Sequence, residues 1–186
     1  TERTLRTLKH GDAFAVLDAY GDMGVELGTP EGIYFRDMRF LSRLKLMCSG
    51  HRPLLLSSVI HDDNSALSID LTNADIEPPS RHPIARDTIA ISRTKFLWNA
   101  ASYERIALRN YDTVERLVSI ELLFDADFVD LFEVRGMPRA RRGQISIKRT
   151  ATDAIQYVYD GLDGVQRRTT LTFTPMPKRL DLHGAV

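Results

Sequence analysis

Short segments in which apolar and polar residues alternate follow one another along this chain. In residues 67–71, leucine, isoleucine and leucine alternate with serine and aspartate, and a period of two also runs through residues 118–125. Alternation of this kind places every second side chain on one face of a β-strand. No segment has the period of an amphipathic helix. A chain with this pattern buries its apolar residues by packing sheets against each other.

The same character recurs in other segments, which are separated by turns rich in Gly, Pro, Asn and Asp. These segments are residues 13–17, 40–48, 54–59, 88–97, 104–110, 144–150, 155–159 and 166–173. The spacing predicts an all-β protein: a large antiparallel β-sandwich, supersandwich-like in size, with about ten or more strands.

The length predicts a single domain. A chain of 186 residues can bury one substantial core, and sandwiches of this size often remain undivided. We therefore expect one domain over residues 1–177. Residues 74–87 contain three prolines and no apolar period, which predicts a long surface loop. Residues 178–186 are expected to start a linker to a downstream domain.

The charge balance limits the kinds of partner. The 25 basic and 25 acidic residues cancel, so no net field draws the chain to nucleic acid or to an anionic membrane. A membrane span needs about 20 apolar residues, and no such run is present. Residues 1–11 lack the apolar segment of a signal peptide. Together these features predict a cytoplasmic protein without nucleic-acid or membrane partners.

Cysteine and histidine usage gives no sign of a metal. Cys48 is the single cysteine, which excludes an intrachain disulfide and a cluster of thiolate ligands. It continues the apolar period of the preceding strand and is expected in the core. The five histidines lack the spacing of zinc ligands. We expect neither a metal nor a cofactor.

Three charged residues, Arg36, Asp37 and Arg39, precede the strand expected at residues 40–48. The planar guanidinium groups could hydrogen-bond a sugar hydroxyl or a carboxylate, and Asp37 could orient one of them. A structural cluster of ion pairs at the start of the strand is the simpler interpretation.

Residues 124–136 place four carboxylates between apolar residues and are expected to form a strand. The carboxylates belong to Asp125, Asp127, Asp130 and Glu133. Glycoside hydrolysis needs two carboxylates on opposite sides of a bond, whereas Asp125 and Asp127 would lie side by side on one face. A calcium loop would need a turn glycine and a closing glutamate, which are absent from this sequence segment. We favour structural pairing with arginines and expect no catalytic residue here.

The segment ends at Arg135, which starts a basic loop over residues 135–143 that includes Arg142. A nucleic-acid surface usually combines basic residues with aromatic residues and a net positive charge, and neither is found. We expect this loop to pair with the preceding carboxylates or with those of a partner domain.

Trp98 and Tyr103 lie near the junction of two expected strands. Exposed aromatic rings can stack on sugar rings, but the only tryptophan of a domain is more often buried. The core interpretation is favoured for Trp98, and sugar binding stays open as the alternative.

Several of these motifs resemble, in the same order, the N-terminal domain of bacterial and archaeal glycogen debranching enzymes of the amylo-alpha-1,6-glucosidase type. The similar segments are residues 32–42, 61–67, 109–111 and 124–136, followed by 141–143. The resemblance extends from about residue 11 to residue 173, and its most specific part is residues 130–136. One difference is Met38, which stands where the resemblance leads us to expect a threonine.

The resemblance implies a β-rich domain that precedes a helical barrel of the (α/α)6 type. The catalytic carboxylates would belong to that barrel, and the β-domain would pack on it and help to shape the substrate cleft. By this interpretation the chain is a non-catalytic accessory domain of an α-glucan debranching glycoside hydrolase. A free-standing module that binds α-glucan through Trp98 and Tyr103 is the main alternative. A small hydrolase that uses two carboxylates of residues 125–133 is a third.

Overall fold

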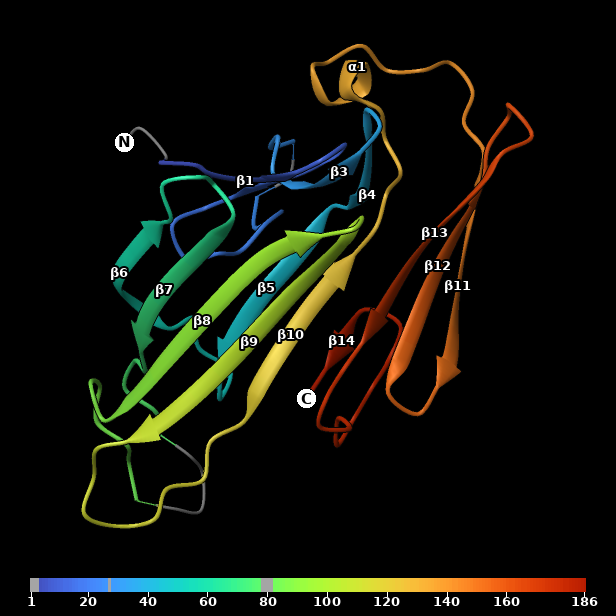
Figure 1. Ribbon diagram of the computed structural model, residues 1–186. Helices are drawn as coiled ribbons and strands as arrows, with labels where there is room; N and C mark the ends of the chain where they lie inside the picture. Colours follow the sequence, from blue (N-terminus) through green and yellow to red (C-terminus); the bar gives the residue numbers. More distant parts are fainter. Residues whose placement is uncertain (1–3, 27, 78–81) are drawn as a thin grey trace.

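The computed structural model describes residues 4–26, 28–77 and 82–186. Within these residues the chain forms fourteen strands in four antiparallel sheets and one helix of four residues (Figure 1). The predicted all-β, sandwich-like fold is confirmed. In the described part of the chain, no helix has the length and apolar character needed to span a membrane.

Three of the sheets follow the sequence order, so most neighbouring strands are joined by short turns. One contains β1 (Arg6–His10), β2 (Ala13–Leu17), β3 (Gly32–Phe35) and β4 (Met38–Leu41); another contains β6 (Leu54–Ile60), β7 (Ala66–Thr72), β8 (Ile89–Trp98) and β9 (Ala101–Asn110). The third contains β11 (Gln144–Ala151), β12 (Ala154–Asp160) and β13 (Gln166–Thr172). In the fourth sheet, β10 (Ile120–Asp125) lies between β5 (Arg43–Cys48) and β14 (Gly184–Ala185).

The β8–β9 hairpin shows how alternation fixes the two faces of a sheet. Its register runs from Ile89 opposite Asn110 to Trp98 opposite Ala101. Along β8, buried residues alternate with more exposed ones, so the odd-numbered side chains point inward.

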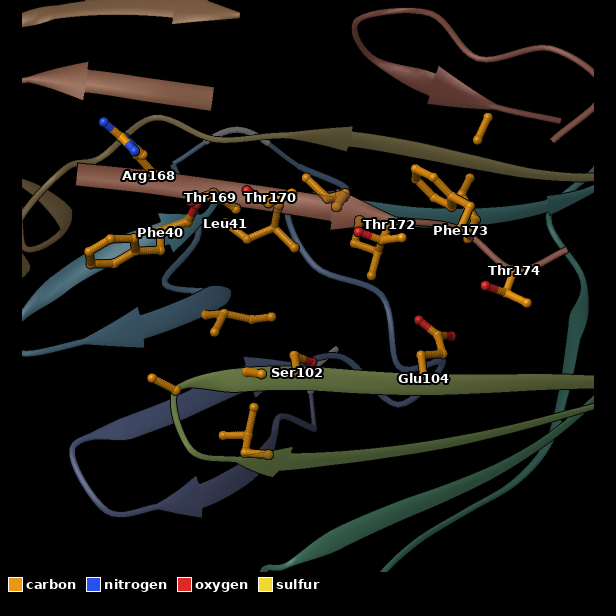
Figure 2. A pocket seen from close by; sticks show the side chains of 18 of the residues that line it. Phe40, Leu41, Ser102, Glu104, Arg168, Thr169, Thr170, Thr172, Phe173 and Thr174 are labelled. Carbon is orange, nitrogen blue, oxygen red and sulfur yellow. The ribbon is translucent and has the colours of Figure 1, made fainter. Parts of the chain in front are cut away.

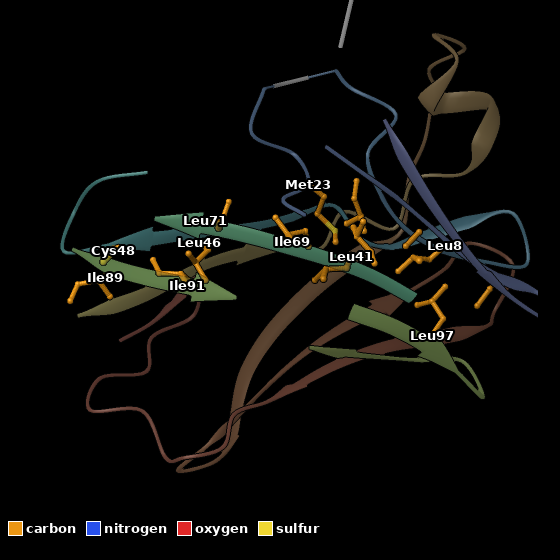
Figure 3. Packing of buried hydrophobic residues seen from close by; sticks show 14 of the residues in the cluster. Leu8, Met23, Leu41, Leu46, Cys48, Ile69, Leu71, Ile89, Ile91 and Leu97 are labelled. Carbon is orange, nitrogen blue, oxygen red and sulfur yellow. The ribbon is translucent and has the colours of Figure 1, made fainter. Parts of the chain in front are cut away.

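The apolar residues that the structure describes form two cores. The first core joins β1 and β2 to β5, β7 and β8, and Figure 3 shows side chains such as Leu46, Ile69 and Ile91 within it. Cys48 is buried there, as expected. The second core joins Phe124 and the residues after it to Tyr157 and its neighbours on β12. Two cores account for a sandwich in which the β11–β13 sheet stands to one side of the other strands (Figure 1).

The predicted strand at residues 124–136 is only partly correct. β10 ends at Asp125, and residues 131–134 form the helix α1 (Leu131–Val134). Phe124 and Phe128 are buried as the alternation predicts, but Phe128 has a positive φ of 49°, which turns the chain out of the sheet. Asp130 then starts α1 as its N-cap.

Residues 178–186 contact the body of the protein. β14 pairs with β10 through Leu122 opposite Ala185, and Leu180 and Ala185 are buried in the second core. The segment that is expected to start a linker thus has partners within the fold. A strand of two residues is too short to show a period in the sequence.

The loop at residues 74–87 is also tied down at both ends. Ile76 and Ile84 form an isolated β-bridge and are buried in the first core. The predicted surface loop thus contains two buried residues, and its residues 78–81 lie outside the described part of the chain.

Candidate functional site

Two segments that are far apart in the sequence meet at one corner of the molecule. The Arg39 amide donates to the Val129 carbonyl (2.8 Å), and the Leu131 amide donates to the Asp37 carbonyl (3.0 Å). These bonds attach the β3–β4 hairpin to the chain that leads into α1, at the upper end of Figure 1. We refer to residues 36–39 and 127–142 as the α1 corner. It contains every predicted site residue except Trp98 and Tyr103.

A bidentate ion pair between Arg39 and Asp127 holds this corner together. Arg39 Nε and Nη2 donate to the two carboxylate oxygens of Asp127, at 3.1 and 2.5 Å. Arg39 Nη1 also donates to the carbonyls of Thr29 (3.0 Å) and Glu31 (3.1 Å). Burial disfavours the charged guanidinium, but the hydrogen bonds and charge of Asp127 outweigh it and raise the pKa of Arg39. The guanidinium is therefore engaged by protein groups, as the structural interpretation predicted.

The next two carboxylates form the N-terminal cap of α1. Asp130 accepts a hydrogen bond from the Glu133 amide (2.9 Å), and Glu133 accepts one from the Asp130 amide (3.0 Å). This reciprocal pair is a capping box. Arg139 contacts the Asp130 carboxylate, and Arg142 lies 3.3 Å from that of Glu133. Burial acts to raise the pKa of Asp130, but the Glu133 amide and Arg139 lower it overall.

The basic loop pairs with the preceding carboxylates, as expected. Arg142 also donates to the Asp127 carbonyl (2.5 Å), so its side chain connects Asp127 to Glu133. None of the carboxylates at Asp127, Asp130 and Glu133 is free, because each has an arginine partner. The arrangement suits a rigid surface better than a pair of catalytic carboxylates.

The outer surface of the corner is a mixture of charge and apolar area. Arg36 and Asp37 form the two-residue turn between β3 and β4, both with positive φ, a combination for which Asn-Gly is the usual sequence. Phe132, in α1, and Met137, shortly after α1, are 63% and 64% exposed. Arg135, at the C-cap of α1, is exposed as well.

Sequence reasoning missed Phe132 and Met137, although a signal was present. Asp130 followed by glutamate three residues later is the pattern of a capping box and predicts a helix start. In a short helix after that cap, the apolar residues of 131–134 cannot all face one core. At least one of them must be exposed.

The predicted aromatic pair lies on the outward face of the β8–β9 hairpin. Tyr103 is opposite Phe96 and stacks on it, with ring centroids 4.9 Å apart. Trp98 lies on the same face and contacts the ring of His10 at 4.5 Å. Phe96, Trp98 and Tyr103, which we call the aromatic strip, are between 42 and 55% exposed. The core interpretation of Trp98 is wrong, and Phe96 was not foreseen.

A large groove separates β9 from β13 (Figure 2). Its volume is about 1040 Å³, and its lining is mostly apolar, with Ile106 and Leu108 on β9 and Leu171 on β13. Glu104 and Ser102 point into it from β9, and Thr172 faces it from β13 (Figure 2). No local sequence pattern indicates this groove, because the two strands lie far apart in the chain.

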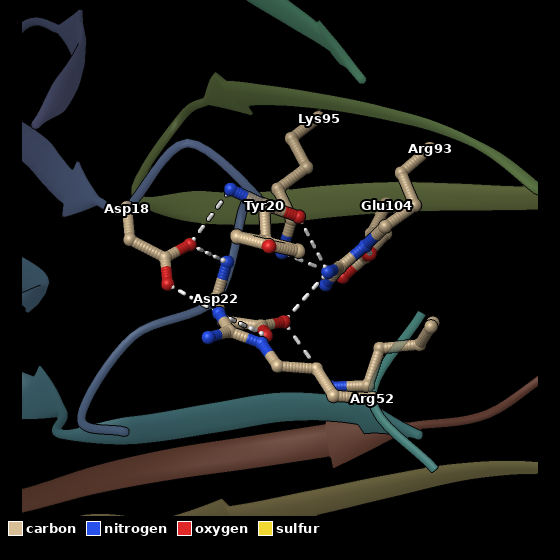
Figure 4. A network of polar contacts seen from close by, with 8 residues as sticks. Asp18, Tyr20, Asp22, Arg52, Arg93, Lys95 and Glu104 are labelled. Atoms are coloured by element: carbon tan, nitrogen blue, oxygen red, sulfur yellow. Dashed lines mark hydrogen bonds and ion pairs between the residues drawn. The ribbon is translucent and has the colours of Figure 1, made fainter. Parts of the chain in front are cut away.

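Beside the groove, Glu104 belongs to a buried network of charges (Figure 4). Arg93 Nε donates to Glu104 (2.6 Å), and Arg93 Nη1 donates to Asp22 (2.6 Å). Lys95 Nζ lies 2.8 Å from the second Glu104 oxygen, and Arg52 contacts Asp22 at 3.0 Å. Burial acts to raise the pKa of Glu104, but Lys95 and Arg93 lower it to about 2. Glu104 is therefore ionised at neutral pH and cannot serve as a general acid.

The described residues offer no metal site: no three or more His, Cys, Asp or Glu side chains are grouped so that they could hold an ion.

The comparison with protein families identifies the chain. Residues 8–186 match the family described as the N-terminal domain of (some) glycogen debranching enzymes. The chain belongs to this family. The resemblance seen in the sequence is thereby confirmed, and the matched region extends through residues 178–186. No curated protein and no solved structure gives a significant match.

Proposed function

We propose that this chain is a non-catalytic accessory domain of a cytoplasmic glycoside hydrolase that debranches glycogen or a related α-glucan. The domain packs on a downstream (α/α)6-barrel in the same polypeptide and helps to shape the substrate cleft of that barrel. The membership of the chain in an N-terminal family of such enzymes supports this proposal. The α1 corner is the surface through which the domain acts.

The observation that carries the proposal is the rigid presentation of Phe132. The capping box fixes the short helix that carries this exposed ring, and Arg139 and Arg142 bind the two capping carboxylates. An exposed aromatic residue on a pre-organised element is typical of the residues that dominate a protein interface. A solvated surface has no need for such a framework.

The experiment measures debranching by the parent enzyme. We expect Phe132→Ala to lower kcat/KM on a branched dextrin by about fivefold or more, because it removes an apolar contact at the interface. Leu162→Ala is the matched control, since Leu162 is equally exposed at 63% in the turn before β13. Equal activity of the two variants and the unaltered enzyme would contradict the proposal.

A second function, binding of α-glucan, is favoured by one observation. The aromatic strip places three exposed rings on a single face of the β8–β9 hairpin, and flat rings of this kind can stack on sugars. Trp98 is the only tryptophan, so its fluorescence reports on the strip directly. A saturable change on adding maltohexaose up to about 1 mM, lost in Tyr103→Ala, supports binding. No change at that concentration would exclude this function for the strip.

A further inference from the structure

The inward face of β8 is covered, whereas that of β9 is open. Ile91 on β8 is fully buried, but Leu108, its partner on β9, is 47% exposed. Ile106, on the same face of β9, lines the groove and is only partly buried against the first core. An apolar strand face that is open to this extent is a surface for association unless another element covers it.

The strand across the groove, β13, presents its edge. Residues 166–173 all line the groove, odd- and even-numbered alike, whereas from residue 102 to residue 108 of β9 only the even-numbered ones do. Successive side chains of a strand point to opposite faces of its sheet, so odd- and even-numbered side chains both border a space only when the edge of the strand faces that space. Among the described residues, β13 pairs with β12 alone. Its second row of backbone N–H and C=O groups is therefore directed toward the groove.

We propose that the groove receives an extended segment of the parent polypeptide, namely the residues that directly follow Val186. This segment pairs with the edge of β13 and packs apolar side chains on Ile106 and Leu108. It extends the β11–β13 sheet by one strand and covers the open face of β9, a form of β-strand addition. The inference rests on the proposed function, because it requires a longer polypeptide.

Three observations favour this occupant. Val186 itself borders the groove and is held there by paired backbone hydrogen bonds with Arg179 (3.1 and 2.9 Å). The chain that follows can thus enter without a long connection. The volume of about 1040 Å³ is at the upper limit of small-ligand pockets, which are roughly 300–1,000 Å³. The groove also runs along the length of β13, as an added strand would.

The test is hydrogen exchange, followed by mass spectrometry, in the parent polypeptide. We expect the amides of β13 and of the residues after Val186 to exchange as slowly as those of β12. Leu108→Lys should speed exchange in β13 and in those following residues by at least about tenfold, because it places a charge against the added strand. Val59→Lys is the control, at an exposed position on β6. Slow exchange in β12 of both variants verifies that the fold is retained.

Other outcomes would overturn the inference. Fast exchange along β13 in the unaltered parent would mean that its edge is open. Protection that depends on protein concentration would indicate a second copy in the groove, and protection that needs maltohexaose would indicate a sugar. If β13 is open but Phe132→Ala still lowers debranching, the inference fails while the proposed function stands. If β13 is protected but the parent shows no debranching, the proposed function fails instead.

Discussion

Arg39 and Asp127, which lie 88 positions apart in the sequence, form a two-point ion pair that joins the β3–β4 hairpin to the chain entering α1. Both side chains are partly buried, at 13% and 30% exposure. The pair thus lies between an exposed salt bridge, which contributes little, and a buried one, whose disruption is costly.

Arg39→Ala should lower the free energy of unfolding by about 2 kcal/mol, because it leaves Asp127 and two carbonyls without their donor. Urea unfolding measures the change. Arg36→Ala is the control: Arg36 contacts Asp12 at 3.5 Å with both side chains largely exposed, so we expect a change below about 0.5 kcal/mol. Similar values for both variants would mean that the α1 corner is not held by this pair.

Asp130→Ala should loosen α1 by removing its N-cap and the partner of Arg139. The expected loss of stability is about 1 kcal/mol. Limited proteolysis should then cut residues 131–142 several times faster than in the unaltered chain, while β12 stays protected. Asp153→Ala, in the turn between β11 and β12, should leave that cleavage rate unchanged. A stable, uncut α1 in Asp130→Ala would show that the capping box is dispensable.

Much of the fold can be predicted from alternation, and the alternation also contains the correct orientation of Trp98. On β8 the apolar residues Ile89, Ile91 and Leu97 are odd-numbered, so the even-numbered Trp98 had to face outward. The tendency of a lone tryptophan to be buried points the other way, and here the parity of the strand is the better guide. Parity also places Arg93 inside, where the sequence alone gives no reason for a charge.

The remaining features depend on contacts between distant segments. Arg93 can be buried because it pairs with Asp22, in the turn after β2, and with Glu104, on β9, and no local pattern shows this. The groove likewise depends on where β13 comes to lie relative to β9. For the candidate site, the sequence identified the charged residues of the α1 corner, but it missed the exposed ring of Phe132 beside them.

The Glu104 carboxylate should make stability depend on pH in the acidic range. In the folded protein the pKa of Glu104 is lowered from 4.5 to about 2. Burial acts to raise this pKa, but the charges and hydrogen bonds of Lys95 and Arg93 outweigh burial. A carboxyl group with a depressed pKa stabilises the fold above its unfolded pKa and loses that effect as pH falls toward the folded value. The unaltered chain should therefore lose about 3 kcal/mol from this group between about pH 5 and pH 2. Glu104→Gln should show a flatter dependence in urea unfolding at the same pH values, and equal slopes would contradict this account.

Arg93 tests whether the buried network is needed for folding. Its side chain is fully buried and donates to Asp22 and Glu104, so Arg93→Ala leaves two buried carboxylates without their shared partner. We expect a loss of about 3–5 kcal/mol, which is enough to unfold a marginally stable domain. Arg93→Met keeps most of the volume but leaves the buried network with an excess of negative charge, and its combination with Glu104→Gln should recover part of the loss, because it removes that excess. Circular dichroism during thermal unfolding measures all three variants. If Arg93→Ala were as stable as the unaltered chain, the ion pairs would not hold β8 and β9 against the turn that carries Asp22.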